Sequence, residues 1–533
     1  LLLITIVTME HKMKSYKLII IITLCLSNIF AIEELPIGFT VEEWANRHLI
    51  IEMGNRTDPP PTPIRNISEF ERMQGVVIRY PFGISTSIIR EMAEDVIIYC
   101  LVSSGQQNSA YNSMNNASVD MNNVEFIIGS TDSYWTRDYG PWWVVDGNND
   151  VSVVDHTYNR PRPNDNQAPL KLSNHLNTPY FESGIITAGG NYMTDGLGIG
   201  ASSDLIYYEN EDLTVNDVHD LMEEYYGITS YHGLPDPNNT YIDHIDCWGK
   251  FLSPTKVLIR SVQTSHAQYD EIEETAEYFE NSLNTFGEPW DVFRVYTPNN
   301  QPYTNSLILN NKAIVPIMNS TWDDEALAVY EEALPGYEVL GFTGSWESTD
   351  ALHCRAKGVP DLGMLQIFHN PLNDVEFAEG NYPVSAEIVP LSGQNIIYGE
   401  VKLFWKNDAM ENYEEIPLIA TDINPYIYNA DIPSSPVETN IQYYIQASDY
   451  SGRTEKLPMA GFYEFHTIGG VVFPAGDANM DEIVNIIDIV LVVNHILGEV
   501  ELNGFPLLLV DMNNDGTINI LDIISIVNVI LGN

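Results

Sequence analysis

The chain has 533 residues, enough for about three to four domains of ordinary size. Hydrophobic residues make up 44% and aromatic residues 11%, so the chain can build folded cores and is not disordered as a whole. Lys and Arg total 24 against 74 Asp and Glu, which gives a net charge of −50. A surface this acidic repels nucleic acid and anionic lipid, and it attracts cations, including positively charged substrates.

The four cysteines are far apart, at Cys25, Cys100, Cys247 and Cys354. None forms a CxxC pair, which argues against a disulfide scaffold and against a thiolate zinc site. Cys25 lies in a predicted export signal, so the mature chain keeps an odd number of thiols. An odd number in an exported protein raises the question of whether one thiol is a reagent.

The first predicted element is that export signal, at residues 1–31. Lys14 and Lys17 precede an apolar run over 18–26, which ends near Ala31 before an acidic stretch. This order is typical of a secretory signal peptide, with Met13 as the true start of the chain.

Two alternatives at this end are disfavoured. The apolar run is too short to span a bilayer comfortably, which argues against a membrane anchor. Leu24 is the wrong neighbour for a lipid anchor on Cys25. No later segment has about 18 uninterrupted apolar residues, so we expect no membrane span in the mature chain and a secreted, extracellular or cell-surface location.

Residues 40–370 alternate apolar strands with amphipathic helices. The patterns predict strands at 76–80, 96–99, 124–128, 151–154, 256–260 and 313–317, and helices at 217–226, 272–286 and 323–333. Repeated small α/β units fit a barrel or a propeller, and the pattern alone does not choose between them.

Four short segments in this region carry groups suited to chemistry. Each has an ordinary interpretation on its own: a tryptophan-rich core, a solvated loop, a surface histidine or a small buried thiol. An extended conformation around His244 would place its side chain on the same face as Asp246. The four segments are the aromatic stretch 134–143 with Trp135 and Asp138, the loop with Arg160 and Arg162, the stretch 241–246 with Tyr241, His244 and Asp246, and 344–355 with Cys354.

Together the four segments supply what attack on a guanidinium group needs. A thiolate is nucleophilic enough for this resonance-stabilised carbon. Two carboxylates can clamp the planar cation, and aromatic walls can sandwich it. A histidine can protonate departing ammonia and then activate water, so no metal is required.

Trp135-Thr-Arg-Asp138-Tyr-Gly-Pro, His244-Ile-Asp246 and Cys354, in this order, resemble the guanidine-modifying (pentein) superfamily. The bacterial-type peptidylarginine deiminases are the most similar members, followed by the agmatine deiminases. The resemblance covers roughly residues 40–370. It implies an α/β fold, a five-fold pseudosymmetric propeller with the active site on its central axis.

The resemblance also implies roles for individual residues. Cys354 is similar to the family nucleophile and His244 to its acid/base, and Asp138 and Asp246 match its guanidinium ligands. The implied path runs through a thiouronium intermediate and loss of ammonia to citrulline, without a catalytic cofactor. Expected further site residues are Asn305 as an active-site polar group, and Trp135 and Tyr241 as substrate-binding groups.

Arg160 and Arg162 favour peptidylarginine as the substrate. In the peptidyl branch two arginines at this place bind the α-carboxylate of a C-terminal arginine, and agmatine has no such group. We therefore expect arginine-containing peptides or proteins as partners. Hydrolysis of agmatine or another small guanidine, amidino transfer from the same intermediate, and a binding protein without activity are the alternatives.

Residues 375–468 show short alternating runs at 399–405, 426–432 and 441–447, separated by turns rich in Pro, Asn, Ser and Gly. This pattern predicts an antiparallel β-sandwich of immunoglobulin-like type. It holds no catalytic cluster, so we expect a spacer or a wall beside the substrate.

Residues 474–533 contain an internal repeat in which each oxygen ligand is displaced by 34 positions. Oxygens at positions 1, 3, 5, 9 and 12 of a loop converge on a cation of Ca²⁺ size. An EF-hand has Glu at position 12 and an entering helix, and the repeat lacks both. The expected ligands are Asp477, Asn479, Asp481, Asn485 and Asp488 in the first loop, and Asp511, Asn513, Asp515, Asn519 and Asp522 in the second.

This departure from the EF-hand resembles a dockerin type I module, a small α-helical calcium-binding domain. The resemblance implies two Ca²⁺ ions and docking onto a cohesin domain of another protein. Position 6 is Gly516 in the second loop but Glu482 in the first, so the first loop departs from the pattern at a turn that prefers glycine.

Overall fold

The computed structural model describes residues 34–240, 242–348, 350–376, 381–421, 424–435, 439–468, 473–481, 483–500, 502, 505–513 and 515–531. The predicted signal peptide lies outside these residues. The chain divides into two compact units. The first comprises the described residues up to Met364 together with 390–393 and 459–461, and the second comprises the remainder.

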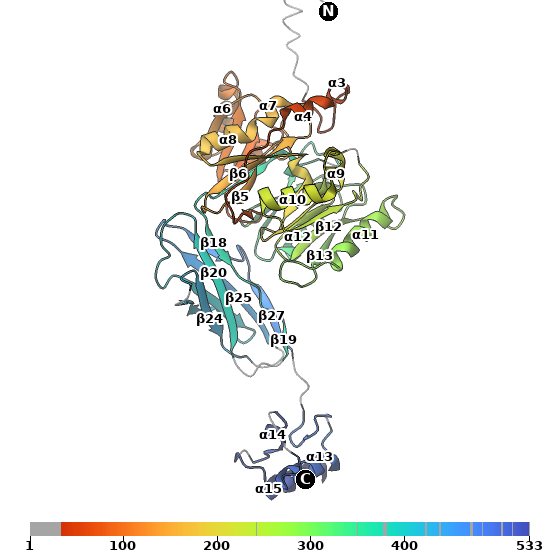
Figure 1. Cartoon of the computed structure of the whole chain (residues 1–533), viewed down its shortest axis with the longest axis vertical. Coiled ribbons are helices and arrows are strands. Elements are labelled where there is room, and N and C mark those ends of the chain that lie inside the picture. Colours follow the sequence, from red (N-terminus) through yellow and green to blue (C-terminus); the bar gives the residue numbers. More distant parts are fainter. Residues whose placement is uncertain are drawn as a thin grey trace, which may run out of the picture. The chain divides into compact units, whose positions relative to one another are not determined.

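The first unit contains five small sheets among its described residues, and all five share one connectivity (Figure 1). In each sheet an antiparallel pair of strands is followed by a parallel strand that a helical crossover reaches. The strand orders are β1 (Arg65–Asn66), β5 (Trp142–Val145), β6 (Val151–Tyr158), β7 (Tyr180–Thr187); β10 (Ser230–Leu234), β9 (Ile199–Ser203), β8 (Met193–Thr194); β11 (Gly249–Phe251), β12 (Lys256–Ser261), β13 (Asp291–Tyr296); β14 (Leu307–Leu309), β15 (Lys312–Ile317), β16 (Glu338–Thr343); and β17 (Lys357–Pro360), β2 (Met73–Arg79), β3 (Ile97–Val102), β4 (Val124–Ile128).

The last of these sheets joins the two ends of the unit, because β17 pairs antiparallel with β2. Residues nearly 280 positions apart, such as Lys357 and Val77, are therefore direct neighbours. This pairing is what brings the segment before β17, which contains Cys354, back to the start of the unit.

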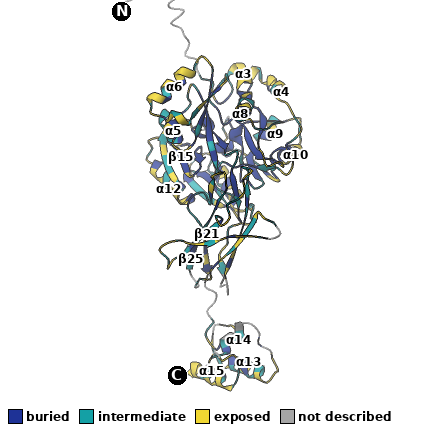
Figure 2. Cartoon of the chain, turned by 90° about the vertical axis from the view of Figure 1, so that its left-hand side faces the viewer, coloured by how far each residue is buried: buried dark blue, intermediate teal, exposed yellow. Residues whose placement is uncertain are grey.

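Helices connect the parallel strands and cover the sheets. They are α5 (Thr86–Met92), α6 (Gln107–Asn116), α7 (Pro163–Asn166), α8 (Ala168–Leu176), α9 (Leu205–Glu209), α10 (Val215–Tyr226), α11 (Tyr269–Glu280) and α12 (Asp323–Ala333), preceded by α3 (Val41–Ala45), η1 (Arg47–Leu49) and α4 (Ile50–Met53). Figure 2 shows buried residues concentrated on the strands and exposed residues on outer helices such as α6. The strands fill the core because their apolar runs are buried on both faces, as in β2 and β15.

Two predicted helices, α10 and α12, end where the sequence pattern places them, and the third differs. The expected helix at 272–286 begins earlier, at Tyr269, and ends at Glu280. The residues after it form a turn in which the Asn284 side chain accepts hydrogen bonds from Phe286 N and Glu288 N, and Gly287 has a φ of +83°. Asparagine and glycine are typical of such turns, and they end the helix despite the apolar spacing.

The β-region of the second unit contains two sheets in its described part. One has the order β18 (Leu365–Phe368), β20 (Tyr382–Pro390), β24 (Ile427–Ile432), β23 (Ile419–Ala420). The other has the order β19 (Val375–Glu376), β27 (Tyr463–Ile468), β25 (Thr439–Ser448), β21 (Lys402–Asn407), β22 (Glu414–Pro417), with β26 (Thr454–Leu457) paired to β25. Burial alternates along β25, so one of its faces packs on a shared apolar core, as the alternating sequence predicts.

The C-terminal module contains α13 (Ile486–Ile496), α14 (Phe505–Val510) and α15 (Ile520–Leu531). A small core that includes Val492, Val510 and Ile526 holds the three helices together. The predicted ligand loops directly precede α13 and α15. Within the part of the chain that the structure describes, every helix is too short or too polar to cross a bilayer.

Candidate active site

Four of the predicted catalytic residues occupy equivalent positions in different sheets. Each of these four lies in the turn just before the first strand of an antiparallel pair. Asp138 precedes β5, Asp246 precedes β11, Asn305 precedes β14 and Cys354 precedes β17. The equivalent turn before β8 is η3 (Gly189–Asn191). The repeated connectivity therefore brings five separate turns to one place.

Hydrogen bonds from the Cys354 turn reach two neighbouring turns. The Cys354 carbonyl accepts a bond of 3.1 Å from Arg137 N. The Asn305 side-chain oxygen accepts bonds from Ala351 N (3.1 Å) and Cys354 N (3.4 Å), and the Asn305 carbonyl accepts one from His353 N. The thiol-bearing turn η5 (His353–Arg355) is thus fixed on both sides.

The remaining turns complete the circle. Asn305 Nδ2 donates to the Asp246 carbonyl (3.4 Å), and Ile245 N donates to the Asn191 side chain (3.2 Å). Gly189 N donates to the Asp138 carbonyl (2.8 Å), and Asp138 follows Arg137 directly. The five turns therefore form a closed ring of hydrogen bonds.

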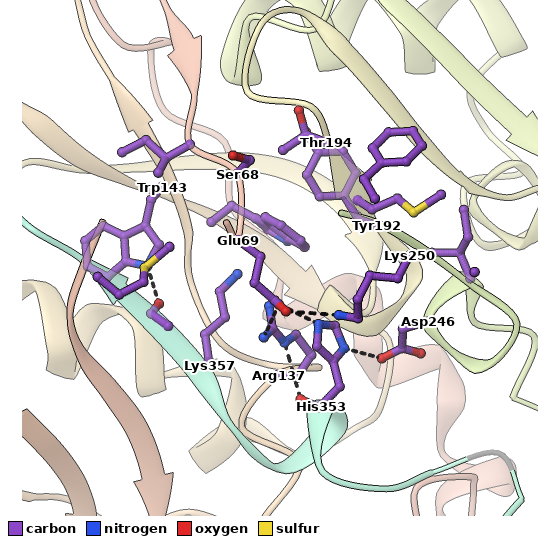
Figure 3. A pocket seen from close by; sticks show the side chains of 18 residues that line it. Ser68, Glu69, Arg137, Trp143, Tyr192, Thr194, Asp246, Lys250, His353 and Lys357 are labelled. Carbon is purple, nitrogen blue, oxygen red and sulfur yellow. Dashed lines mark hydrogen bonds and ion pairs between the residues drawn. The ribbon is translucent and has the colours of Figure 1, made fainter. Parts of the chain in front are cut away.

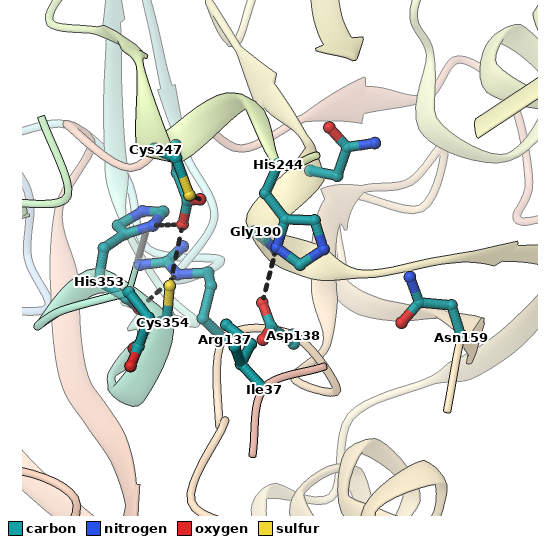
Figure 4. A network of polar contacts seen from close by, with 12 residues as sticks. Ile37, Arg137, Asp138, Asn159, Gly190, His244, Cys247, His353 and Cys354 are labelled. Atoms are coloured by element: carbon teal, nitrogen blue, oxygen red, sulfur yellow. Dashed lines mark hydrogen bonds and ion pairs between the residues drawn. The ribbon is translucent and has the colours of Figure 1, made fainter. Parts of the chain in front are cut away.

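The thiol of Cys354 and the carboxyl group of Asp246 are in direct contact inside this ring. Cys354 Sγ lies 3.6 Å from Asp246 Oδ2, and Asn305 Nδ2 donates to Sγ over 3.3 Å. All three side chains are buried, and Cys354 is fully inaccessible to solvent. Figure 4 shows the thiol, Asp138 and His244 converging from separate segments of the chain.

Asp138, Asp246 and His244 converge beside Gly190. A methyl group added at this glycine would lie 2.6 Å from Asp138 Oδ1 and 3.0 Å from both Asp246 Oδ2 and His244 Nδ1. The backbone N–H of Gly190 also donates to Asp138 Oδ1 over 3.2 Å. Only glycine lets the two carboxyl groups and the imidazole come this close, and two neighbouring carboxylates can pair with the N–H groups of one guanidinium.

His244 reaches the site through a different backbone than expected. The sequence suggests an extended stretch, but residues 245–247 form the 3₁₀ turn η4 (Ile245–Cys247), so the extended assignment is wrong for them. His244 precedes this turn, and its Nδ1 lies 3.7 Å from Asp138 Oδ1. The side chains of His244 and Asp246 therefore point to the same place because the backbone turns between them, and not because they alternate along an extended strand.

The site carries an excess of negative charge. Burial raises the pKa of the Cys354 thiol well above its usual value, and the carboxylates of Asp246 and Asp138 raise it further. Burial also raises the pKa of Asp138 well above normal, and Asp246 adds to this effect. A cationic substrate would relieve both, because a positive charge favours the ionised forms of thiol and carboxyl alike.

His244 is neutral at neutral pH. Burial lowers its pKa to about 4, although the charge of Asp246 opposes this change. Both of its ring nitrogens are buried and make no hydrogen bond to any described residue. A neutral imidazole with free nitrogens can accept a proton and then return it.

Two residues that the sequence analysis did not single out complete the network. His353 Nδ1 lies 2.6 Å from Asp246 Oδ2, and His353 Nε2 lies 2.7 Å from Glu69 Oε2. Ionised carboxylates only accept, so these two bonds need two protons among the three groups. Burial opposes ionisation of Glu69, but His353, Lys250 and Arg137 hold the pKa of Glu69 well below its usual value. The hydrogen bonds from Glu69 through His353 to Asp246 fix the orientation of the Asp246 carboxyl group.

Glu69, His353 and Asp246 also line a small cavity of about 40 Å³, which Figure 3 shows from close by. Arg137, Lys250 and Lys357 contribute basic groups to its wall, and Glu69 pairs with the first two. Burial lowers the pKa of Lys357 well below its usual value, and its amine lies 3.8 Å from the centre of the Trp142 ring. The volume leaves room for a few water molecules beside His353.

The predicted substrate-binding residues that the structure describes bond other parts of the chain. Trp135 is buried, and its Nε1 donates to the Leu35 carbonyl over 2.9 Å. Arg160 Nε donates to the Ile37 carbonyl over 2.9 Å. Arg162 pairs with Glu43 over 2.6 Å, so its guanidinium is not free for a ligand in this conformation. Tyr241 lies outside the described residues.

The two predicted cation loops have the same internal bonding. In the first loop, Asp488 accepts bonds from the backbone N–H groups of Ala478, Asn479 and Asn485. In the second, Asp522 accepts them from Met512 and Asn519. The last carboxylate thus ties the start of each loop to the following helix.

The loops lie in a segment that is rich in acidic side chains. Each loop holds three aspartates, and residues 473–531 contain no Lys or Arg. Among the described residues no three His, Cys, Asp or Glu side chains are grouped as a metal site, and the last carboxylate of each loop bonds backbone N–H groups. Hard oxygen donors in a segment of this composition suit a divalent cation of Ca²⁺ type.

Known proteins share both parts of this architecture. The agmatine deiminase of Medicago truncatula is 24% identical over 294 residues, covering 44% of this chain and 78% of that protein. A solved agmatine deiminase from Enterococcus faecalis has a TM-score of 0.51 and 16% identity, covering 58% of this chain and 99% of that chain. The first unit thus has the fold of a guanidine-modifying deiminase.

The family model of the Porphyromonas-type peptidyl-arginine deiminases matches residues 78–360, and that of the dockerin type I domain matches residues 475–531. The chain belongs to this deiminase family and carries a dockerin type I domain after it. Its catalytic class is that of hydrolases acting on a guanidino C–N bond.

Substitution of Gly190 by alanine tests whether the arrangement of Asp138, Asp246 and His244 matters. The new methyl group would push these three side chains out of place, so we expect kcat/KM to fall by at least about 100-fold while the fold is retained. Gly105→Ala is the matched control, because a methyl group there meets nothing within 4 Å. Retention of activity in Gly190→Ala, measured by ammonia release, would place the cation elsewhere.

Proposed function

We propose that the chain is an exported peptidylarginine deiminase that converts the guanidinium of a C-terminal arginine to citrulline and ammonia. The observation that carries the proposal is the convergence of Cys354, Asp246, Asp138 and His244 on one point. Membership of the peptidyl-arginine deiminase family supports it. The acidic surface favours approach of a cationic substrate.

The first half of the reaction forms a covalent intermediate. Asp138 and Asp246 hold the guanidinium, whose charge lowers the pKa of the Cys354 thiol. The thiol gives its proton to His244 as its sulfur bonds to the guanidinium carbon. His244 then protonates one nitrogen, the C–N bond breaks, and ammonia leaves a thiouronium on the sulfur.

The second half restores the enzyme. Water gives a proton to His244 and bonds to the same carbon, which becomes tetrahedral again. The C–S bond then breaks, and sulfur recovers a proton from His244. The hydroxyl on the carbon loses its proton to the solvent and becomes the carbonyl of the ureido group, and citrulline leaves. One water is consumed and one ammonia is released, without an oxidant, a reductant or a metal. The role of Asn305 in this scheme is to hold the sulfur by its Nδ2 donor.

Substrate selection is the finer part of the proposal. Arg160 and Arg162, with Trp135, are proposed to bind the α-carboxylate and the aliphatic stem of the terminal arginine, and Tyr241 to lie beside them. The five-fold propeller belongs to the same proposal, and the shared connectivity of the five sheets supports it. We likewise propose an immunoglobulin-like type for the β-region at 375–468.

Agmatine is the second candidate substrate. The relatives named above include agmatine deiminases, and Arg162 is already paired with Glu43. Asn159, which Figure 4 places beside the network, donates to Glu209 over 2.5 Å, and Oε2 of Glu209 is buried without a hydrogen bond to a described residue. A carboxylate in this position would suit the terminal amine of agmatine.

A substrate panel separates the two candidates. We expect a peptide that ends in arginine to be converted faster than its C-terminal amide, a peptide with internal arginine, free arginine or agmatine, measured as citrulline and ammonia. Cys354→Ala abolishes the activity, whereas Cys100→Ala, a buried thiol in β3, retains it. Agmatine preferred over every peptide overturns the substrate assignment, and full activity of Cys354→Ala overturns the mechanism.

For the C-terminal module we propose two Ca²⁺ ions, docking onto a cohesin domain, and thereby an extracellular or cell-surface location. Exposed apolar residues repeat on α13 and α15 at a spacing of 34 positions, which gives two similar faces that a partner can cover. They are Ile486, Ile487 and Val490 on α13, and Ile520, Leu521 and Ile524 on α15.

Chelation tests the calcium sites. We expect EDTA to lower the melting temperature of this module and Ca²⁺ to restore it, because binding to the folded state alone stabilises it. Asp515→Asn should weaken Ca²⁺ binding at least about tenfold, whereas Glu499→Gln, an exposed acid of the same module, should not. Deiminase activity should survive EDTA. An unchanged melt of the module, followed by circular dichroism, contradicts the proposal.

A further inference from the structure

The segment Glu34–Glu43, which lies outside the 78–360 match to the deiminase family, contacts each of the proposed substrate-binding residues that the structure describes. Trp135 and Arg160 donate to the carbonyls of Leu35 and Ile37. Figure 4 includes Ile37 among the residues drawn with the Cys354 network. The segment thus runs as a peptide along the residues that we expect a substrate peptide to meet.

Arg162 binds this segment most extensively. Its Nη2 donates to the carbonyls of Pro36 (2.7 Å) and Gly38 (3.0 Å). Its Nε donates to Glu43 Oε1 (2.6 Å), and Nη2 also reaches Glu43 Oε2 (3.3 Å). The Glu43 carboxylate is therefore already bound to the Arg162 guanidinium in the bidentate geometry that arginine offers to any carboxylate.

The Glu43–Arg162 pair is buried, with Arg162 only 1% exposed. Burial tends to raise the pKa of Glu43, but the hydrogen bonds and charge of Arg162, together with Thr40, hold the pKa below its usual value, so Glu43 is ionised at neutral pH. Removing one member of a buried pair leaves the other charge uncompensated. Arg162 would then favour any other carboxylate that could reach it.

The catalytic groups are closed to solvent in the conformation that contains this segment. With it in place, Cys354, Asp138, His244 and Asp246 are each at most 3% exposed. Nη1 of Arg162 and Oδ2 of Asp138 are buried and have no hydrogen-bond partner among the described residues. A substrate that reached these atoms would have to displace neighbouring chain. The segment is bound by Arg160 and Arg162, which the substrate itself needs, and its first residue is also held by Arg79, which pairs with Glu34 over 2.7 Å.

We propose that Glu34–Glu43 is a built-in competitor of the substrate, in which Glu43 takes the place on Arg162 that the carboxylate of a C-terminal arginine occupies. The segment withdraws when that carboxylate binds. This inference rests on the proposed function. It makes Glu43 a specificity determinant, because a ligand without a carboxylate cannot replace it on Arg162 and bears the full cost of opening the site.

Glu43→Gln tests this competition while preserving the local fold. Glu43 also accepts a bond from Thr40 N in the capping box of α3, and glutamine keeps that bond and the side-chain volume but loses the charge. We expect KM for a peptide ending in arginine to fall at least about fivefold more than KM for its C-terminal amide, with kcat nearly unchanged. Glu42→Gln, the exposed neighbour on α3, should leave both KM values unchanged.

A second measurement uses the unmodified segment. In Cys354→Ala, saturation with the arginine-ending peptide should increase hydrogen exchange of the backbone amides of residues 34–43, and saturation with agmatine should increase it less. If the segment is a fixed wall, exchange does not increase and Glu43→Gln changes only the melting temperature. Conversion of the peptide by the wild-type protein with an unchanged ratio of KM values overturns this inference alone. Failure to convert any peptide overturns the proposed function and the inference with it.

Discussion

The catalytic arrangement depends on the closed ring of hydrogen bonds among the five turns that precede β5, β8, β11, β14 and β17. Asp138 and Asp246 are buried near one point, and two ionised carboxylates at such a place repel each other and lose hydration. Without a fixed backbone, the side chains of Asp138 and Asp246 would move apart. Because the ring fixes the backbone, as in the Asn305 bonds to the Cys354 turn, the side chains have little freedom to separate.

The charges of the site are complete only when a cation is present. On one side, Asp246 accepts from His353, which in turn bonds Glu69 among Arg137 and Lys250. On the other side, Asp138 and Asp246 lie close together beside Gly190, where the Asp138 carboxyl group accepts a hydrogen bond only from the backbone N–H of Gly190 among the described residues. The protein therefore supplies basic groups on the Glu69 side of Asp246, and under the proposed function the substrate supplies the positive charge on the Asp138 side. The raised pKa of the Cys354 thiol fits the proposed mechanism, in which a bound guanidinium would favour the thiolate.

Much of this was predictable from the sequence, and the reasons differ between residues. Strands such as β2 and β15 are buried on both faces, so their apolar runs identify them without a partner. Cys354, His244 and Asp246 are recognisable because their chemistry is rare and their order resembles a known family. Glu69 carries no such signal: it is one of 74 acids, and only the pairing of β17 with β2 explains why it meets His353. His353 was adjacent to the thiol but had no visible partner.

The differences have local causes. The turn at 245–247 replaces an extended stretch because its conformation is set by the ring, where Ile245 N bonds Asn191, and alternation along the sequence cannot reveal such a constraint. The pairing of Arg162 with Glu43 joins residues 119 positions apart, and sequence spacing gives no information on it. Burial of a charged residue is a property of the fold as a whole.

The most direct test of the central claim is mass spectrometry of the protein after acid quenching during turnover of an arginine-ending peptide. The account predicts a transient adduct on Cys354 with the mass of the peptide less ammonia, absent when the peptide carries lysine in place of arginine. Turnover without any adduct on Cys354, or with an adduct on another residue, would contradict it.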